Sequence, residues 1–141
     1  MKRPYISKSL KTKVTRQANY RCGYCQAPQH LMVVKLEIEY IIPLSQGGTS
    51  DEDNLWLCCS TCNMYKGSKV AFNDPESDRL VPLFNPRLQN WAEHFKWSND
   101  GTEIIGITET GRATVEALKL NNELSVATRR FWVLLGEFPP L

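Results

Sequence analysis

Residues 36–67 read LEIEYIIPLSQGGTSDEDNLWLCCSTCNMYKG, and this segment decides the fold. It begins inside a run rich in Val, Ile and Leu, 31–42, which predicts a β-strand. The stretch 45–50 contains two adjacent glycines and predicts a flexible loop. A short helical segment is predicted at 54–57 and a further helix at 61–68. The expected local order is therefore strand, loop and helix.

Two Cys-x-x-Cys pairs flank this order. Cys22 and Cys25 precede the strand, and Cys59 and Cys62 begin the second helix. Each pair offers two thiolates from one turn, and two such pairs can form a tetrahedral site for structural zinc. Cys58 is the spare cysteine, and we expect its side chain to point away from the metal, although an exchange with Cys59 or Cys62 stays open.

The charge is unevenly distributed along the chain. Residues 1–36 contain eight Lys or Arg and no acidic residue, whereas 37–141 contain nine basic and fifteen acidic residues, which gives a net charge of +2. The segment 9–18 is predicted as a helix with Ser9 as its N-cap. A basic segment on an acidic body favours a polyanionic partner, most simply nucleic acid. The eight basic residues are Lys2, Arg3, Lys8, Lys11, Lys13, Arg16, Arg21 and Lys35.

Composition excludes several classes of protein. Hydrophobic residues make up 42% of the chain, which is too many for a disordered protein. No apolar run is long enough for a membrane span, and no apolar region follows the basic start as it would in a secretory signal. The odd number of cysteines argues for a reducing compartment, so we expect a cytoplasmic protein. The length suits one domain, or a small domain with an elaboration.

The C-terminal part, 71–141, is predicted as an extension that packs on the core 1–70 as one domain. The Asn-Asp-Gly sequence at 99–101 lies between two apolar runs and indicates a hairpin. The stretch 70–86 is predicted to be irregular. Two helices are expected, at 111–120 and 122–135.

The central segment closely resembles the HNH endonuclease family. That family has an acidic residue and a His before Ile-Ile-Pro, then a Gly-Gly loop, an Asn-Leu pair and a closing Cys-x-x-Cys-Asn-x-x-Lys-Gly run. The resemblance covers roughly 21–68, and 82–87, 91–97 and 111–115 are similar to an extension found in a prokaryotic branch of the family. It implies an α+β fold with a small ββα-metal core, a four-cysteine zinc site, and a C-terminal hairpin and two helices.

The resemblance also implies a hydrolase that cleaves phosphodiester bonds of DNA with a catalytic Mg²⁺ or Mn²⁺ ion. Glu39 takes the acidic metal-ligand position, and Asn63 takes the last motif position, which also ligates the ion. Asn54 takes the position that orients the general base, and Glu37 is expected to assist as a nearby carboxylate that does not itself ligate the ion. Oxygen ligands of this kind are the ones Mg²⁺ prefers.

The general-base position is occupied by Tyr40 where the family has His. A tyrosine side chain is almost wholly protonated near pH 7, so we expect weakened or abolished cleavage. Three explanations stay open: a natural variant of degraded activity, an engineered inactive nuclease, or a base supplied by His30 or His94. The alternative functions are an inactive DNA-binding zinc module and a protein-interaction module on the same scaffold.

The expected partner is DNA, double-stranded and contacted through its phosphates with weak sequence preference. A protein partner or dimerisation through the C-terminal region is a further possibility, and no membrane association is expected. Arg87 is an additional candidate for phosphate contact. The main predicted contacts are Lys11, Lys13, Arg16, Arg21, Lys66 and Lys69.

Overall fold

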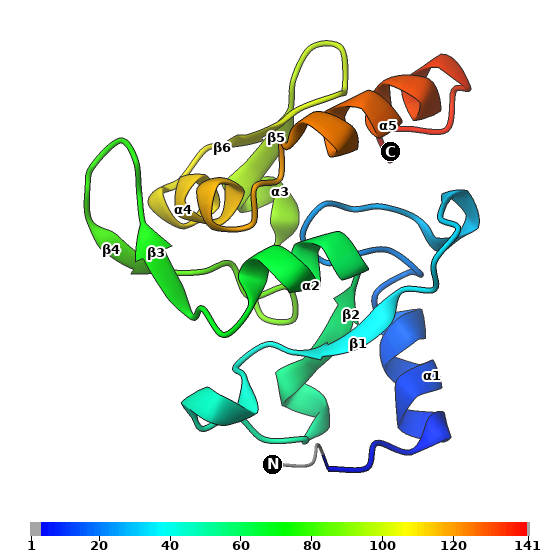
Figure 1. Cartoon of the computed structure of the whole chain (residues 1–141), viewed down its shortest axis with the longest axis vertical. Coiled ribbons are helices and arrows are strands. Elements are labelled where there is room, and N and C mark those ends of the chain that lie inside the picture. The colour runs from blue at the N-terminus through cyan, green and yellow to red at the C-terminus, as the bar shows by residue number, and fades with distance from the viewer. Residues whose placement is uncertain (1–3, 141) are drawn as a thin grey trace. The chain divides into compact units, whose positions relative to one another are not determined.

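The computed structural model describes residues 4–140, so Lys2 and Arg3 of the basic segment lie outside the described residues. The chain divides into two compact units. The first is the described part of Met1–Val70 together with Asn85–Leu88, and the second is Ala71–Phe84 with the described part of Gln89–Leu141. The described residues form five α-helices and three two-stranded antiparallel sheets, which confirms the α+β class (Figure 1).

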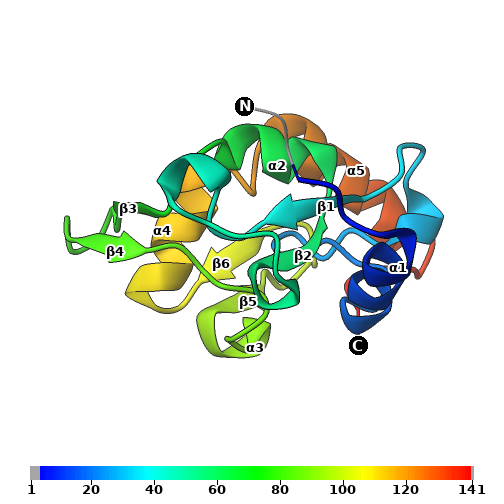
Figure 2. The same cartoon turned by 90° about the horizontal axis from the view of Figure 1, so that it is seen from below.

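The first unit is built on a hairpin that leads into a helix. Strand β1 (Glu37–Tyr40) pairs antiparallel with β2 (Leu55–Cys58), and α2 (Ser60–Lys66) follows directly (Figures 1 and 2). The helix predicted at 54–57 is therefore wrong. Leu55 and Leu57 are buried on the hairpin, and pairing with β1 satisfies the backbone groups of this apolar run.

The strand predicted at 31–42 is much shorter than expected. A 3₁₀ turn, η1 (Gln29–Leu31), occupies its start, and two further 3₁₀ turns, η2 (Leu44–Gln46) and η3 (Glu52–Asn54), lie between the two strands. Within the predicted range, only the four residues of β1 pair with another strand, so only these form a β-ladder.

Helix α1 (Lys8–Gln17) packs its apolar face on the hairpin. Val14 is fully buried in one cluster with Tyr40 and Leu55. The cap is Ser7 rather than the predicted Ser9, because the Ser7 side chain accepts a hydrogen bond from the Leu10 amide at 3.2 Å. The exposed residues of this helix include Lys8, Lys11, Lys13 and Arg16.

The short segment Asn85–Leu88 belongs to the first unit because Arg87 holds it there. Its guanidinium donates to the carbonyl of Leu55 through Nε at 3.2 Å and through Nη2 at 3.0 Å. It also lies 4.9 Å from the centre of the Trp56 ring, a cation–π contact. Arg87 is therefore engaged within the unit, which weakens the prediction that it contacts phosphate.

The second unit contains two hairpins and three helices. The hairpin predicted around 99–101 is confirmed, and Gly101 adopts the left-handed backbone that its turn requires, with φ of 76°. The stretch predicted as irregular contains a second hairpin instead, closed by the buried carboxylate of Asp74. The elements are β3 (Ala71–Asn73), β4 (Leu80–Pro82), α3 (Trp91–His94), β5 (Phe95–Trp97), β6 (Ile104–Gly106), α4 (Glu109–Ala117) and α5 (Glu123–Leu134).

No helix in the described range 4–140 combines the length and the apolar character that crossing a membrane requires.

Candidate active site and zinc site

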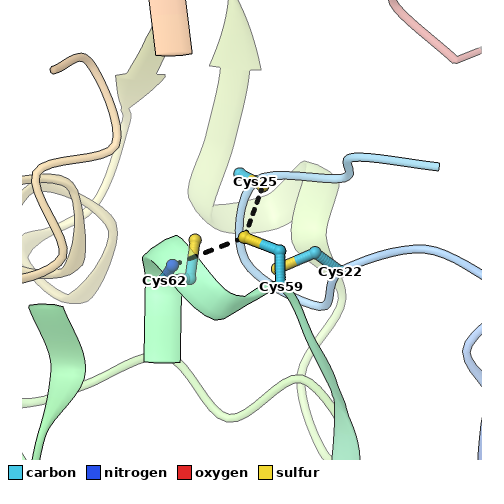
Figure 3. Close-up of side chains that lie close together, drawn as sticks. All are labelled: Cys22, Cys25, Cys59 and Cys62. Atoms are coloured by element: carbon cyan, nitrogen blue, oxygen red, sulfur yellow. Dashed lines mark hydrogen bonds between the residues drawn. The ribbon is translucent and has the colours of Figure 1, made fainter. Parts of the chain in front are cut away.

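Four cysteines meet at the start of α2. Cys22 and Cys25 come from the turn after α1, Cys59 is the N-cap of α2, and Cys62 lies in its first turn (Figure 3). Their sulfur atoms all lie within 4.8 Å of one another, and all four side chains are buried. The Cys59 Sγ accepts a hydrogen bond from the Cys62 amide at 3.4 Å, which fixes one ligand relative to the helix.

These distances fit a tetrahedral zinc site. A Zn–S bond of about 2.3 Å implies sulfur atoms about 3.8 Å apart, and the Cys25 and Cys59 sulfurs are separated by 3.7 Å. Burial opposes ionisation of Cys22, but hydrogen bonds from the neighbouring thiols lower its pKa well below the ordinary value. Contact with Cys22 in turn raises the pKa of Cys25 and Cys62. Four thiolates therefore need a bound cation to coexist here.

Cys58 lies outside the group of four, as the sequence predicts for the spare cysteine. Its thiol donates to the carbonyl of Cys59 at 3.3 Å. A hydrogen-bonding contact with Cys22, followed by burial, raises the pKa of Cys58. Its side chain is therefore next to the cluster rather than directed away from it, and it supplies no ligand in this arrangement.

Glu39 is the most unusual side chain of the hairpin, because it is a carboxylate with only 1% of its surface exposed. Its Oε1 accepts a hydrogen bond from the Tyr24 hydroxyl at 2.5 Å. Its Oε2 accepts no hydrogen bond from the described residues, and the Lys66 Nζ lies 3.8 Å away. Buried polar atoms normally have a hydrogen-bond partner, so this oxygen keeps an unused acceptor site, and a carboxylate oxygen of this kind fits a divalent cation.

Burial raises the pKa of Glu39 to about 7, while the Lys66 charge and the Tyr24 hydrogen bond act in the opposite direction. Burial also raises the pKa of Tyr24, and the Glu39 charge adds to that effect. Nothing in the motif identifies Tyr24 as a site residue. The only sequence signal is an aromatic residue inside the first Cys-x-x-Cys turn.

Asn63, on α2, and Glu37, on β1, lie next to each other. The Asn63 amide donates to the Glu37 carboxylate at 2.9 Å. Asn63 also lines a pocket of about 240 Å³ together with Tyr40 and Pro43. The carboxylate in direct contact with Asn63 is thus the exposed Glu37, and Glu39 lies deeper, beside Lys66. Glu37 is consequently more central than the sequence suggests.

Tyr40 is both a core residue and a pocket residue. Only 5% of its surface is exposed, and it packs with Val14 and Leu55. Its hydroxyl forms a hydrogen bond of 3.2 Å with the Ser50 hydroxyl. The phenol therefore has a structural role in the core of this unit, and Ser50 is a neighbour that the motif does not identify.

Asn54 holds the loop that follows Tyr40. Its Nδ2 donates to the carbonyls of Ile42 at 2.9 Å and Thr49 at 2.8 Å, and its Oδ1 accepts from the Ile42 amide at 2.9 Å. A Cβ on Gly48 would lie 1.7 Å from the Ile42 carbonyl oxygen, so only glycine fits beside this junction. Asn54 thus positions the backbone just after Tyr40.

The basic side chains predicted to contact phosphate differ in their exposure and in their partners within the protein. Lys66 is only 2% exposed and donates to the Ile41 carbonyl at 2.9 Å, so the structure removes it from the set of phosphate contacts. Arg21 donates to the Gln26 carbonyl at 3.1 Å, and Lys13 pairs with Glu52 at 2.8 Å. The side chains that stay on the exposed surface are Lys11, Lys13, Arg16 and Lys69.

The two histidines lie apart from this arrangement in sequence and environment. His94 belongs to the second unit, where its Nδ1 forms a hydrogen bond of 2.7 Å with the Thr108 hydroxyl and its ring packs on Phe84. This environment is that of a packed structural histidine. His30 is exposed in η1, before β1.

Residues 22–69 match the family model described as HNH endonuclease. The match confirms the resemblance over the segment that contains the hairpin, α2 and the four cysteines. Comparisons with curated proteins and with solved structures find no match to the chain. The family match supports a nuclease-type function that acts on DNA and depends on bound metal.

Proposed function

We propose that this protein is an endonuclease that hydrolyses phosphodiester bonds of DNA with one divalent ion, and that Tyr40 keeps its activity low. The observation that carries the proposal is the Oε2 atom of Glu39, a buried carboxylate oxygen that accepts no hydrogen bond from the described residues. A buried carboxylate oxygen is costly to leave without a hydrogen bond, even where a cation lies nearby. Lys66, at 3.8 Å, is too far for a hydrogen bond.

Glu39 and Asn63 are the residues we assign to the ion, with Glu37 beside Asn63 as a further oxygen donor. Carboxylate and amide oxygens fit Mg²⁺ or Mn²⁺. The bound ion would neutralise the negative charge that develops on the phosphate and on the leaving oxygen. Tyr24 and Lys66 hold the Glu39 carboxylate in place by one hydrogen bond and one ion pair.

We expect the slow step at this site to be removal of a proton from the attacking water. A general base contributes about 10²–10⁴ in rate. The Tyr40 hydroxyl forms a hydrogen bond with Ser50, and its ring is packed in the core. Tyr40 therefore does not supply the basic nitrogen that a histidine would place at this position. Binding of DNA and metal is therefore expected to survive where cleavage is weak.

A plasmid-nicking assay with Mg²⁺, with Mn²⁺ and without added divalent ion tests the proposal. We expect Tyr40→His to cleave at least about tenfold faster than the native chain. Tyr40→Phe is the matched control, because it keeps the ring in the core and should cleave like the native chain. Adding Glu39→Gln to Tyr40→His should return cleavage to background.

Equal cleavage by the native chain and by a folded Tyr40→His variant would contradict the assignment of the base position. The packing of Tyr40 against Val14 and Leu55 favours one second function, a DNA-binding zinc module that does not cleave. In that case both chains would bind DNA and neither would nick the plasmid.

A further inference from the structure

A groove of about 660 Å³ extends along the first unit beside the hairpin. Its lining residues come from the chain before α1, from α1 and the turn after it, and from the chain leading into β1 and β1 itself. Glu37 and Tyr40 are among its lining residues, and Tyr40 also lines the smaller pocket that contains Asn63. The groove and the pocket that contains Asn63 therefore share Tyr40 as a lining residue.

The walls of the groove are basic. Lys8 and Lys11 lie three residues apart and so share one stripe of α1, and Lys35 contributes from the other side. All three are exposed, and Glu37 is the one acidic side chain among the described residues that line the groove. Three positive charges against one negative charge favour a polyanion.

Two exposed aromatic rings distinguish this groove from an ordinary basic surface. Tyr5 is 88% exposed and Tyr20 is 51% exposed, and both line the groove. Large aromatic side chains are normally buried to a greater extent. Aromatic rings in a basic groove are the combination that binds single strands, because bases stack on the rings while the backbone follows the charges.

We propose that this groove binds an unpaired DNA strand, with Lys8, Lys11 and Lys35 at its phosphates and with Tyr5 and Tyr20 stacked on its bases. In a duplex the faces of the bases are covered by their neighbours, so the tyrosine rings would have nothing to stack on. The substrate would then be DNA with a single-stranded region, rather than the fully paired duplex expected from the sequence. This inference rests on the proposed function and specifies its substrate.

Equilibrium binding of a labelled oligonucleotide tests the groove without cleavage. The full chain is titrated in zinc-containing buffer without Mg²⁺, against the unpaired strand and against the same strand in a blunt duplex. We expect at least about fivefold tighter binding of the unpaired strand, from stacking on two rings. Three phosphate contacts predict that log K falls with log salt with a slope of about −2.

The aromatic contribution is tested by conservative pairs of variants. Tyr5→Leu and Tyr20→Leu remove the ring while keeping bulk, and each should weaken single-strand binding about fivefold. Tyr5→Phe and Tyr20→Phe keep the ring and should bind like the native chain. None of these changes should affect duplex binding.

The charge contribution has a charge-matched control in the second unit. Lys8→Ala with Lys11→Ala should make the salt slope shallower by about 1.4. Lys96→Ala with Lys119→Ala removes the same charge from exposed residues of the second unit that are not among the proposed DNA contacts, so the slope for the unpaired strand should stay unchanged.

Tighter binding of the duplex, or unchanged single-strand binding in both Leu variants, would overturn the groove assignment. Equally tight binding of polyglutamate would also overturn it, because that ligand has charge but no bases. The nicking assay reports separately on the proposed function. If Tyr40→His cleaves DNA while the Leu variants bind normally, only the groove proposal fails. If the groove binds the unpaired strand as expected while Tyr40→His does not cleave, only the catalytic proposal fails.

Discussion

The two units of the molecule are stabilised by different means. All five cysteines belong to the first unit, where the central apolar cluster consists of Val14, Tyr40 and Leu55 with partly buried neighbours. The second unit has no cysteine and contains a chain of packed aromatic rings. The rings of that chain are Phe84, Phe95, Trp91, Trp97, Trp132 and Phe138.

The two units also differ in how their buried polar groups are satisfied. In the second unit the Arg129 guanidinium donates to the carbonyls of Thr102 and Leu120, so protein atoms satisfy one another. In the first unit Glu39 and four thiols are buried with incomplete partners. A region that leaves such groups unsatisfied depends on ligands for its stability, and a region that satisfies them internally does not.

The largest expected effect follows from removing zinc. Cys22→Ser, or treatment with a chelator, should unfold the first unit, because a small core of this kind is held together by its metal. The second unit should keep its fold. Hydrogen exchange of backbone amides, read separately for 4–70 and 89–140, measures both outcomes in the full chain.

Cys58→Ser is the control for this experiment, since Cys58 is buried but lies outside the group of four. It should leave the first unit folded and able to retain zinc. Unchanged amide protection in 4–70 after chelation would show that the apolar cluster alone is sufficient, and the contrast between the units would disappear.

The features that the sequence predicts correctly are those set by a few neighbouring residues. The two Cys-x-x-Cys turns and the Asn-Asp-Gly hairpin are both local, and both are present. The sequence predicts a helix where the strand at 55–58 lies, because a short apolar run fits the periodicity of a helix as well as that of a strand. Pairing with β1 makes it a strand.

The features that the sequence does not reveal depend on distant partners. The β3–β4 hairpin is closed by Asp74, whose carboxylate pairs with Arg112 from α4. The burial of Lys66 depends on the carbonyls of Tyr40 and Ile41, which lie on another element. A charged residue is normally solvated, so a buried lysine of this kind needs the fold to be known first.

A change of pH should affect the second unit through Asp74. The Arg112 guanidinium donates to both Asp74 oxygens at 2.9 Å, and it holds the pKa of that carboxyl well below its usual range. A lowered pKa means that the stabilisation is present above the ordinary Asp pKa of about 4 and is lost as the pH falls further. We expect Asp74→Asn to lower the melting temperature of this unit at pH 7 by at least about 5 °C.

The pH dependence below about pH 4 should also become weaker in Asp74→Asn, as followed by amide NMR signals of 71–140. Glu76→Gln is the matched control, because Glu76 contacts the same Arg112 at 3.2 Å but is largely exposed. Exposed pairs contribute little, so this variant should melt like the native chain. An equal loss in both variants would mean that burial of Asp74 is not what makes the pair stabilising.

The smallest expected effect comes from removing one helix cap in each unit. Ser7 caps α1 by accepting from the Leu10 amide at 3.2 Å, and Asn122 caps α5 by accepting from the Ser125 amide at 3.0 Å. Replacing either cap by Ala should cost its own unit about 1 kcal/mol. The costs are alike, but the units should differ in how the loss can be reversed.

Stability of a zinc-held unit rises with the logarithm of the free zinc concentration, by about 1.4 kcal/mol per tenfold. The loss in Ser7→Ala should therefore be offset by about fivefold more free zinc in a metal buffer, whereas the loss in Asn122→Ala should not respond to zinc. Regional hydrogen exchange measures the two shifts in parallel. If zinc restored both variants equally, or neither, the metal would not be a stabilising ligand specific to the first unit.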